Sequence, residues 1–421
     1  MQTIQLLLKN LFWRFLLLFI LFYIVPYDLG YSITDKASEL TIWDTPIMWI
    51  GETFYNWEFQ LDRLYKGYDS KFEFCRYIFV FFVATIGTLL WLLIDKFLQK
   101  EYTNKLKIIT QTILRYHLGL TLINYGLAKI FMLQFGTIGI DTMEQTIGGL
   151  TGMTFMSHFY SYSQIVIPFS GWLEFIGGIL LLFRRTTFLG AILLIIVMGN
   201  VVLMNWDFGF TVTMYATLLF CLLLMLISTQ LKSLLNYVVL NKTTQSEAYK
   251  PLVNSKKIRI IFKVALISLV GYFYIQEYSD KITEYKTNRY AWFTNLQTVE
   301  TFVVNNDTLA STTSKNKSEA WKKITFNGFS SYPESFEVIT EKGSYERFKF
   351  EIDSTTKIIR YRPFFDKTQD WSELKYKKTD KRKYTFEGIY KKDTISVTTK
   401  AKYLNDYILM YYRGKLLFDD Y

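Results

Sequence analysis

The chain changes its hydrophobic pattern once, near residue 276. Before that point, long apolar runs recur at residues 8–27, 75–97, 108–133, 165–183, 186–206, 211–227 and 258–275. Each run holds about 17 to 25 residues, which is enough for an α-helix to cross the hydrocarbon core of a bilayer. The pattern therefore predicts a membrane all-α bundle of about seven transmembrane helices.

After residue 276, apolar and polar side chains alternate with a period of two, as they do in half-buried β-strands. Turn-like residues separate the clearest stretches, which lie at residues 335–341, 345–353, 357–364, 383–390, 394–403 and 407–418. Consecutive strands joined by short turns favour antiparallel pairing. We therefore expect a β domain of six or more antiparallel strands, built as a small barrel or a sandwich.

The basic residues predict an orientation for the helices. Lys and Arg gather after the second run and in the loop 228–257, whereas the loops 134–164 and 207–210 have none. Because cytoplasmic loops are enriched in Lys and Arg, the N-terminus should be inside and the C-terminus outside. The same rule accounts for much of the net charge of +11, and the tail mixes basic with acidic residues, so we expect no nucleic-acid partner.

These patterns divide the chain into four parts. Residues 1–107 form two transmembrane helices with a long extracytoplasmic loop, in which Trp43, Trp49 and Trp57 favour a helix at the membrane surface. Residues 108–227 form a four-helix core. Residues 228–284 form a cytoplasmic loop, the seventh helix and a linker, and residues 285–421 form an extracytoplasmic β-rich domain.

The four-helix core carries polar residues on helix faces that also carry glycines. The polar set is Arg115, Tyr125, Lys129, Glu174, Asn200, Asn205 and Asp207. The glycines that would allow close helix packing are Gly119, Gly126, Gly171, Gly177 and Gly178. Steps of three and four residues place Arg115 and Lys129 on one face of the third run, and Gly171, Glu174 and Gly178 on one face of the fourth.

An ionisable group at membrane depth requires a partner or a function, and Glu174 is such a group. In one interpretation, Glu174 pairs with Lys129 or Arg115 in a structural clasp that fixes the helix register. In the other, the polar residues line a pocket for a quinone or a lipid headgroup, in which Arg115 balances Glu174 or anchors the headgroup. The sequence leaves both interpretations open.

Haem binding, metal binding and thiol chemistry have less support in the sequence. His117 and His158 would have to lie at one depth to hold a haem, but the predicted topology places them in opposite halves, so haem is not expected. Neither a metal site nor a catalytic residue can be assigned, and Cys75 and Cys221 form no redox pair. Residues 148–163 could form either a re-entrant segment or, with more support, an ordinary surface helix.

Two strings in the core support a resemblance to a known family. LRYHLGLTLINYGLAKI at residues 114–130 is followed by LEFIGGILLLFRRTTFLGAILLIIVMGNVVLMN at residues 173–205. They resemble the DoxX family of four-helix bacterial and archaeal membrane proteins. In that family an Arg opens the first helix, a G-x-A-K element closes it and an E-x-x-G-G element starts the second. These fall here on Arg115, on Gly126 to Lys129 and on Glu174 to Gly178.

The resemblance implies a membrane subunit of a quinone-linked or thiol-linked redox system, because named members belong to a terminal quinol oxidase and to thiosulfate oxidation. We therefore expect an accessory protein of the bacterial cytoplasmic (inner) membrane. It would bind a quinone or lipid-like ligand in its core and another envelope or membrane protein through its outer domain. The alternative is a non-catalytic envelope assembly or interaction protein whose membrane part is an anchor. A transporter ranks last, because paired broken helices are not visible in the sequence.

Overall fold

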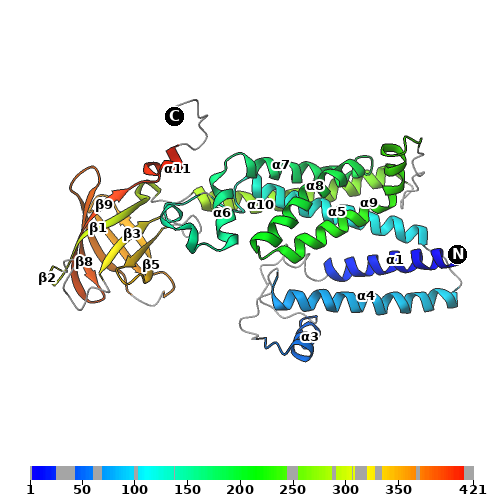
Figure 1. The fold of residues 1–421 in the computed structure, drawn as a ribbon, viewed down its shortest axis with the longest axis horizontal. Coiled ribbons are helices and arrows are strands. Elements are labelled where there is room, and N and C mark those ends of the chain that lie inside the picture. The colour runs from blue at the N-terminus through cyan, green and yellow to red at the C-terminus, as the bar shows by residue number, and fades with distance from the viewer. Residues whose placement is uncertain are drawn as a thin grey trace. The chain divides into compact units, whose positions relative to one another are not determined.

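The protein consists of two compact units in the computed structural model (Figure 1). The structure describes residues 2–24, 43–59, 69–98, 103–136, 138–243, 255–286, 291–305, 307–308, 320–327, 334–366 and 370–411. The helical unit comprises Met1–Ile130 and Phe169–Val270. The barrel unit comprises Phe131–Pro168 and Gly271–Tyr421, so it combines the C-terminal domain with the loop that follows the third predicted span.

The helical unit is built mainly from long apolar helices. They are α1 (Gln2–Tyr23), α3 (Asp44–Tyr55), α4 (Lys71–Leu98), α5 (Thr103–Ile130), α7 (Val166–Leu182), α8 (Thr187–Phe208) and α9 (Thr213–Val238). A further helix, α10 (Lys256–Lys286), continues from this unit into the barrel unit. Helix α3 lies in the loop between the first two predicted spans and contains Trp49. Gly209 caps the C-terminus of α8, and its positive φ of 67° is the left-handed conformation that favours glycine at this position.

Several of these helices are suited to a membrane. In the described part of the chain, the segments Lys71–Asp95, Thr187–Phe208 and Lys256–Ile282 are long and apolar enough to cross one. A fourth span results if α7 and the preceding α6 (Gly152–Tyr162) are taken as one broken span. The chain is therefore a membrane protein by composition, while its seven crossings and their orientation stay predictions.

A row of tyrosines joins the N-terminal helices to the core. Tyr77 of α4 stacks on Tyr23 of α1 with ring centroids 5.5 Å apart, and Tyr23 stacks on Tyr215 of α9 at 6.2 Å. Tyr215 in turn lies 6.4 Å from Tyr125 of α5. Stacked aromatic rings contribute more than their buried area alone, so this row fixes α1 and α4 against α5 and α9.

The C-terminal strands form a closed antiparallel barrel, which decides between the two predicted β architectures. The strands are β1 (Asn295–Val304), β2 (Asp307–Thr308), β3 (Trp321–Phe326), β4 (Ser335–Thr340), β5 (Tyr345–Asp353), β6 (Ile358–Pro363), β7 (Ser372–Lys378), β8 (Lys383–Tyr390) and β9 (Asp393–Lys402). Strand β9 pairs back with β1, from Leu296 opposite Lys402 to Val304 opposite Ile395. This pairing closes a barrel of eight strands, to which the short β2 adds an edge (Figure 1).

The alternation of side chains along each strand explains the barrel core. In β5, Phe348, Phe350 and Ile352 point inward and are buried, while the residues between them are more exposed. Aromatic rings from several strands fill the interior. The ring centroids of Phe326 and Phe336, for example, are 5.2 Å apart.

One predicted strand was wrong. Residues 407–418 read as an alternating strand, but Leu404–Asp406 form the short helix η7 and Ile408–Tyr411 form the helix α11, while residues 412–418 lie outside the described part. Because β9 already pairs with both β8 and β1, the barrel presents no free strand edge beside β9. The segment after β9 therefore finds no partner there with which to form a strand.

Glu144 attaches the loop between α5 and α7 to the barrel. It ends the short helix η3 (Thr142–Glu144), and its carboxylate accepts hydrogen bonds from Tyr407 at 2.6 Å, from Lys402 at 3.3 Å and from Lys323. Burial alone would raise the pKa of this carboxyl, but the hydrogen bonds from Lys323, Tyr407 and Lys402 outweigh it and hold the pKa at about 2.

This depressed pKa predicts an acid-sensitive contribution to the stability of the barrel unit. The stabilisation by Glu144 is fully present above the pKa that this carboxyl has in the unfolded chain. It is lost as the pH falls from about 5 toward 2. We expect Glu144→Gln to lower the free energy of unfolding by about 1 kcal/mol at neutral pH, because the site is partly exposed. We also expect the variant to flatten the acid dependence, as measured by near-UV circular dichroism of thermal unfolding. Glu341→Gln, which removes the exposed contact with Lys322, is the matched control and should change neither property. Parallel acid profiles for Glu144→Gln and the wild type would contradict this account.

Candidate functional site

Helices α5 and α7 touch through their backbones. A Cβ atom on Gly126 would lie 2.7 Å from the carbonyl oxygen of Gly171, and one on Gly178 would lie 2.7 Å from that of Gly119. Real Cβ atoms do not approach so closely, so glycine is required for the small-residue packing that membrane helices use. The fifth predicted glycine, Gly177, instead lies against α8.

The close contact holds Lys129 over Glu174. The Cβ atom of Lys129 occupies the space where Gly171 lacks a side chain, since an added Cβ there would lie 2.8 Å from it. The Nζ of Lys129 donates a hydrogen bond to Oε1 of Glu174, and the two residues are only 6% and 1% exposed. Lys129 also lies in the last turn of α5, where the free carbonyl groups favour a cation.

The ion pair leaves hydrogen-bonding capacity unused. Among the described residues, the second carboxylate oxygen of Glu174, Oε2, is buried and has no hydrogen-bond partner. The ammonium of Lys129 carries three N–H groups, of which the bond to Glu174 uses one. A buried charged group with an unmet acceptor costs free energy. The pair therefore offers an acceptor and a donor side by side to a small molecule.

Arg115 does not join this pair. Its guanidinium donates hydrogen bonds at 3.0 Å to the carbonyl oxygens of Leu181 and Leu182 at the end of α7. Lys263 of α10 donates to the same Leu182 oxygen at 2.8 Å. Fourteen residues of helix separate Arg115 from Lys129, a rise of about 21 Å, so Arg115 acts at the C-terminal end of α7 while Lys129 acts at Glu174, near the middle of that helix. Arg115 thus caps a helix terminus, and the structure does not pair it with Glu174.

The remaining predicted polar residues lie in three different settings. Tyr125 is in the tyrosine row described above, one helical turn before Lys129. Asn200 and Asp207 are exposed on α8. Asn205 is buried at the end of α8, and within the described residues its side-chain Nδ2 has no hydrogen-bond partner. The structure therefore brings together Lys129 and Glu174, and it places Asn205 in a separate polar environment.

Two further buried charge clusters were missed by the sequence analysis. In the N-terminal helix pair, Arg14 of α1 pairs with Asp95 of α4, and its Nε lies 3.1 Å from Oδ2. In a second cluster, Arg76 bonds Glu73 at 2.9 Å and the backbone oxygen of Tyr23 at 2.7 Å. The available signal was a charged residue inside or beside an apolar run, the same signal that identified Glu174.

The two histidines lie in different units. His117 is on α5 in the helical unit, whereas His158 is on α6 in the barrel unit and shares a hydrogen bond of 3.2 Å with Gln145. Part of the segment 148–163, for which two interpretations were open, forms helix α6. Within the residues that the structure describes, no three His, Cys, Asp or Glu side chains gather as metal ligands would.

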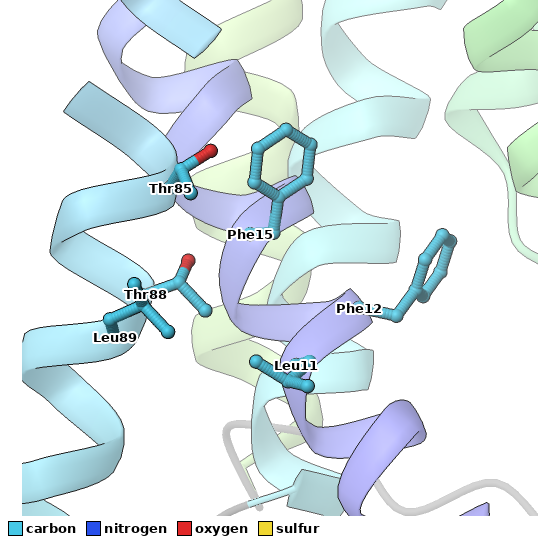
Figure 2. Close-up of a pocket in the computed structure, with 6 residues that line it drawn as sticks. All are labelled: Leu11, Phe12, Phe15, Thr85, Thr88 and Leu89. Atoms are coloured by element: carbon cyan, nitrogen blue, oxygen red, sulfur yellow. The ribbon is translucent and has the colours of Figure 1, made fainter. Parts of the chain in front are cut away.

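A surface pocket of about 280 Å³ lies between α1 and α4 (Figure 2). Leu11, Phe12 and Phe15 line it from α1, and Thr85, Thr88 and Leu89 line it from α4. Both threonine hydroxyls donate hydrogen bonds to carbonyl groups of their own helix, at 2.8 and 2.7 Å. The lining is otherwise apolar, so this pocket suits a hydrocarbon chain and offers little to specify a headgroup.

Comparison with known proteins identifies a family and a relative. The sequence profile of the DoxX family matches residues 110–206, which include the glycine contacts and the Lys129–Glu174 pair. Over 113 residues the chain is 34% identical to the uncharacterized protein YwoB of Bacillus subtilis (strain 168). That alignment covers 27% of this chain and 71% of YwoB. No solved structure is significantly similar to the chain.

Proposed function

This chain belongs to the DoxX family, and from that premise we propose that it is an accessory membrane protein with a ligand site at the Lys129–Glu174 pair. The ligand is a quinone or a lipid-like molecule with one polar group. The protein resides in the bacterial cytoplasmic membrane, and its barrel unit docks another envelope or membrane protein.

The Oε2 atom of Glu174, which has no hydrogen-bond partner among the described residues, carries this proposal. A buried carboxylate oxygen accepts hydrogen bonds, so it suits a ligand hydroxyl such as that of a quinol. The ammonium of Lys129 can donate to a carbonyl oxygen such as that of the oxidised quinone. A site that offers both groups suits a ligand that exists in both forms, and the surrounding apolar helices suit its hydrocarbon ring and tail.

Two observations support the extracytoplasmic position of the barrel unit. The loop 134–164 has no Lys or Arg, which favours the outer side for it. Glu144 in this loop is hydrogen-bonded to Lys323, Lys402 and Tyr407 of the C-terminal domain, so the loop and the barrel belong on the same side of the membrane. Both features agree with an inside N-terminus and an outside C-terminus.

Ligand-induced stabilisation of the purified full-length protein tests the site. We expect a short-chain quinol to raise the midpoint of thermal unfolding of the wild type. A ligand at a hundred times its Kd stabilises a protein by about 2.7 kcal/mol. The increase should disappear in Glu174→Gln. It should persist in Asp95→Asn, which removes the Arg14–Asp95 ion pair of the N-terminal helices. Equal increases in all three proteins would contradict a ligand site at Glu174.

The burial of the pair favours a second candidate function. Glu174 is 1% exposed and α5 touches α7 through glycine backbones, so a ligand can reach Oε2 only if neighbouring side chains move. In this alternative the pair is a structural clasp, the membrane part is an anchor, and the protein is an envelope assembly or interaction protein acting through its barrel unit. Two results together would support this alternative. The quinol would change the thermal unfolding of none of the proteins, and the full-length chain would recover a specific protein through its barrel unit.

A further inference from the structure

A groove of about 530 Å³ lies where α4 begins and where the turn joins α8 to α9. We call it the α4–α9 groove. Its lining includes Trp57, Asp69, Lys71, Phe74, Asn205 and Trp206. Of these, Trp57 to Phe74 lie outside residues 110–206, so the groove is formed jointly by the family core and by segments to which the family profile does not extend. It involves neither Lys129 nor Glu174.

Hydrogen bonds build the frame of this groove. The carboxylate of Asp69 accepts the backbone N–H groups of Thr213 at 2.6 Å and of Met214 at 2.8 Å. These are first-turn N–H groups of α9, which have no partner within the helix, so Asp69 caps α9 from a distant part of the chain. The negative charge of Asp69 is thereby directed at a helix N-terminus. It also ties the start of α4 to the α8–α9 turn.

Two donors in the groove remain available to an anionic or carbonyl-bearing ligand. Asn205 is 7% exposed, and among the described residues its Nδ2 has no hydrogen-bond partner. A buried amide without an acceptor is costly, and rotation of the amide can present its donor to the groove. The ammonium of Lys71 is exposed and lies 5.4 Å from the ring centroid of Trp57, so a cation–π contact positions it.

The lining also carries exposed aromatic rings. Trp206 is 66% exposed and Phe74 is 37% exposed, although both lie at the ends of membrane-type helices. Tryptophan is enriched at the level of lipid headgroups, where its ring contacts acyl chains while its N–H meets polar groups. The groove therefore combines one cation, one amide and several aromatic rings, which suit the phosphate, ester and acyl groups of a lipid.

We propose that the α4–α9 groove binds one phospholipid, and that this site is independent of the proposed ligand site in the core. Lys71 contacts the lipid phosphate and the Asn205 amide donates to an ester carbonyl. The rings of Trp206 and Phe74 pack against the upper part of an acyl chain. A lipid held here bridges α4 to the α8–α9 turn and stabilises the attachment of the N-terminal helices.

Native mass spectrometry of the full-length protein in mild detergent tests the proposal, with phosphatidylglycerol added in steps. We expect one phospholipid to remain bound to the wild type at activation energies that remove the others. Lys71→Met and Trp206→Leu change exposed side chains, so both variants should fold, and each should weaken this binding by about tenfold or more. The matched controls are Lys256→Met, another exposed lysine at a helix start, and Trp172→Leu, another exposed membrane tryptophan. Neither control should alter the binding.

Equal retention of the lipid by the groove variants and the controls would overturn the proposal. A thermal shift caused by inorganic phosphate or glycerol phosphate, with the same dependence on Lys71, would also overturn it, because the site would then recognise a free anion. The outcome is separable from that of the core site, since Glu174→Gln should leave phospholipid retention unchanged.

Discussion

Lys129→Met is expected to destabilise the helical unit by about 3 to 5 kcal/mol, because it leaves Glu174 buried without its cation. The pair lies among apolar helices with Glu174 1% exposed, so water cannot replace the ammonium. Removing both charges should be far less harmful than removing one, and we expect Lys129→Met with Glu174→Gln to recover at least half of the loss. The measurement is a denaturing-detergent titration followed by far-UV circular dichroism of the helices.

A second buried ion pair provides the comparison. Arg14→Met should destabilise through Asp95 in the same way, and its effect should add to that of Lys129→Met, because one pair joins α1 to α4 and the other joins α5 to α7. If the double variant Lys129→Met/Glu174→Gln is no more stable than Lys129→Met alone, the unpaired carboxylate is not the cause. The account of the ion pair would then be contradicted.

Gly126→Ala should separate α5 from α7 and destabilise the helical unit by about 3 kcal/mol, at the upper end of overpacking effects. The added Cβ would lie 2.7 Å from the oxygen of Gly171 and 2.7 Å from the nitrogen of Phe175. Both are backbone atoms of a packed helix, so neither can rotate away as a side chain can. The same detergent titration measures the loss, and reduced insertion into the membrane would accompany it.

The same substitution at Gly199 is the matched control. A Cβ on Gly199 would lie 3.5 Å from the ring of Phe220, an ordinary contact, in a helix of similar apolar character. Alanine favours the helix over glycine by up to about 1 kcal/mol, so Gly199→Ala should be neutral or stabilising. Equal destabilisation by the two substitutions would show that helix separation at Gly126 is not the cause.

Much of this architecture follows from local sequence. The apolar runs predicted long helices, and period-two alternation predicted the antiparallel β domain. In the core, Lys129 and Glu174 each follow a glycine by three residues, and a close helix contact is enough to bring two such side chains together. Spacing therefore predicted the glycine faces and a cation of the third run near Glu174, but it left the choice between Lys129 and Arg115 open.

Features that depend on long-range register could not be anticipated. The choice of a barrel over a sandwich rests on β9 returning to β1, which no single strand encodes. The tyrosine row requires four helices to meet at one level, and its members lie far apart in the chain. The position of Arg115, by contrast, could have been judged from the sequence. The rise along α5 separates Arg115 from Lys129 by too great a distance for both to contact one carboxylate.

The most direct test of the core site is the extraction of small molecules from the protein purified from its native membranes, analysed by mass spectrometry. The account predicts a stoichiometric quinone or other apolar molecule in the wild type and in Asp95→Asn, and its loss in Glu174→Gln. An equal content of such molecules in all three proteins would contradict it. The Lys129–Glu174 pair would then be a structural clasp alone.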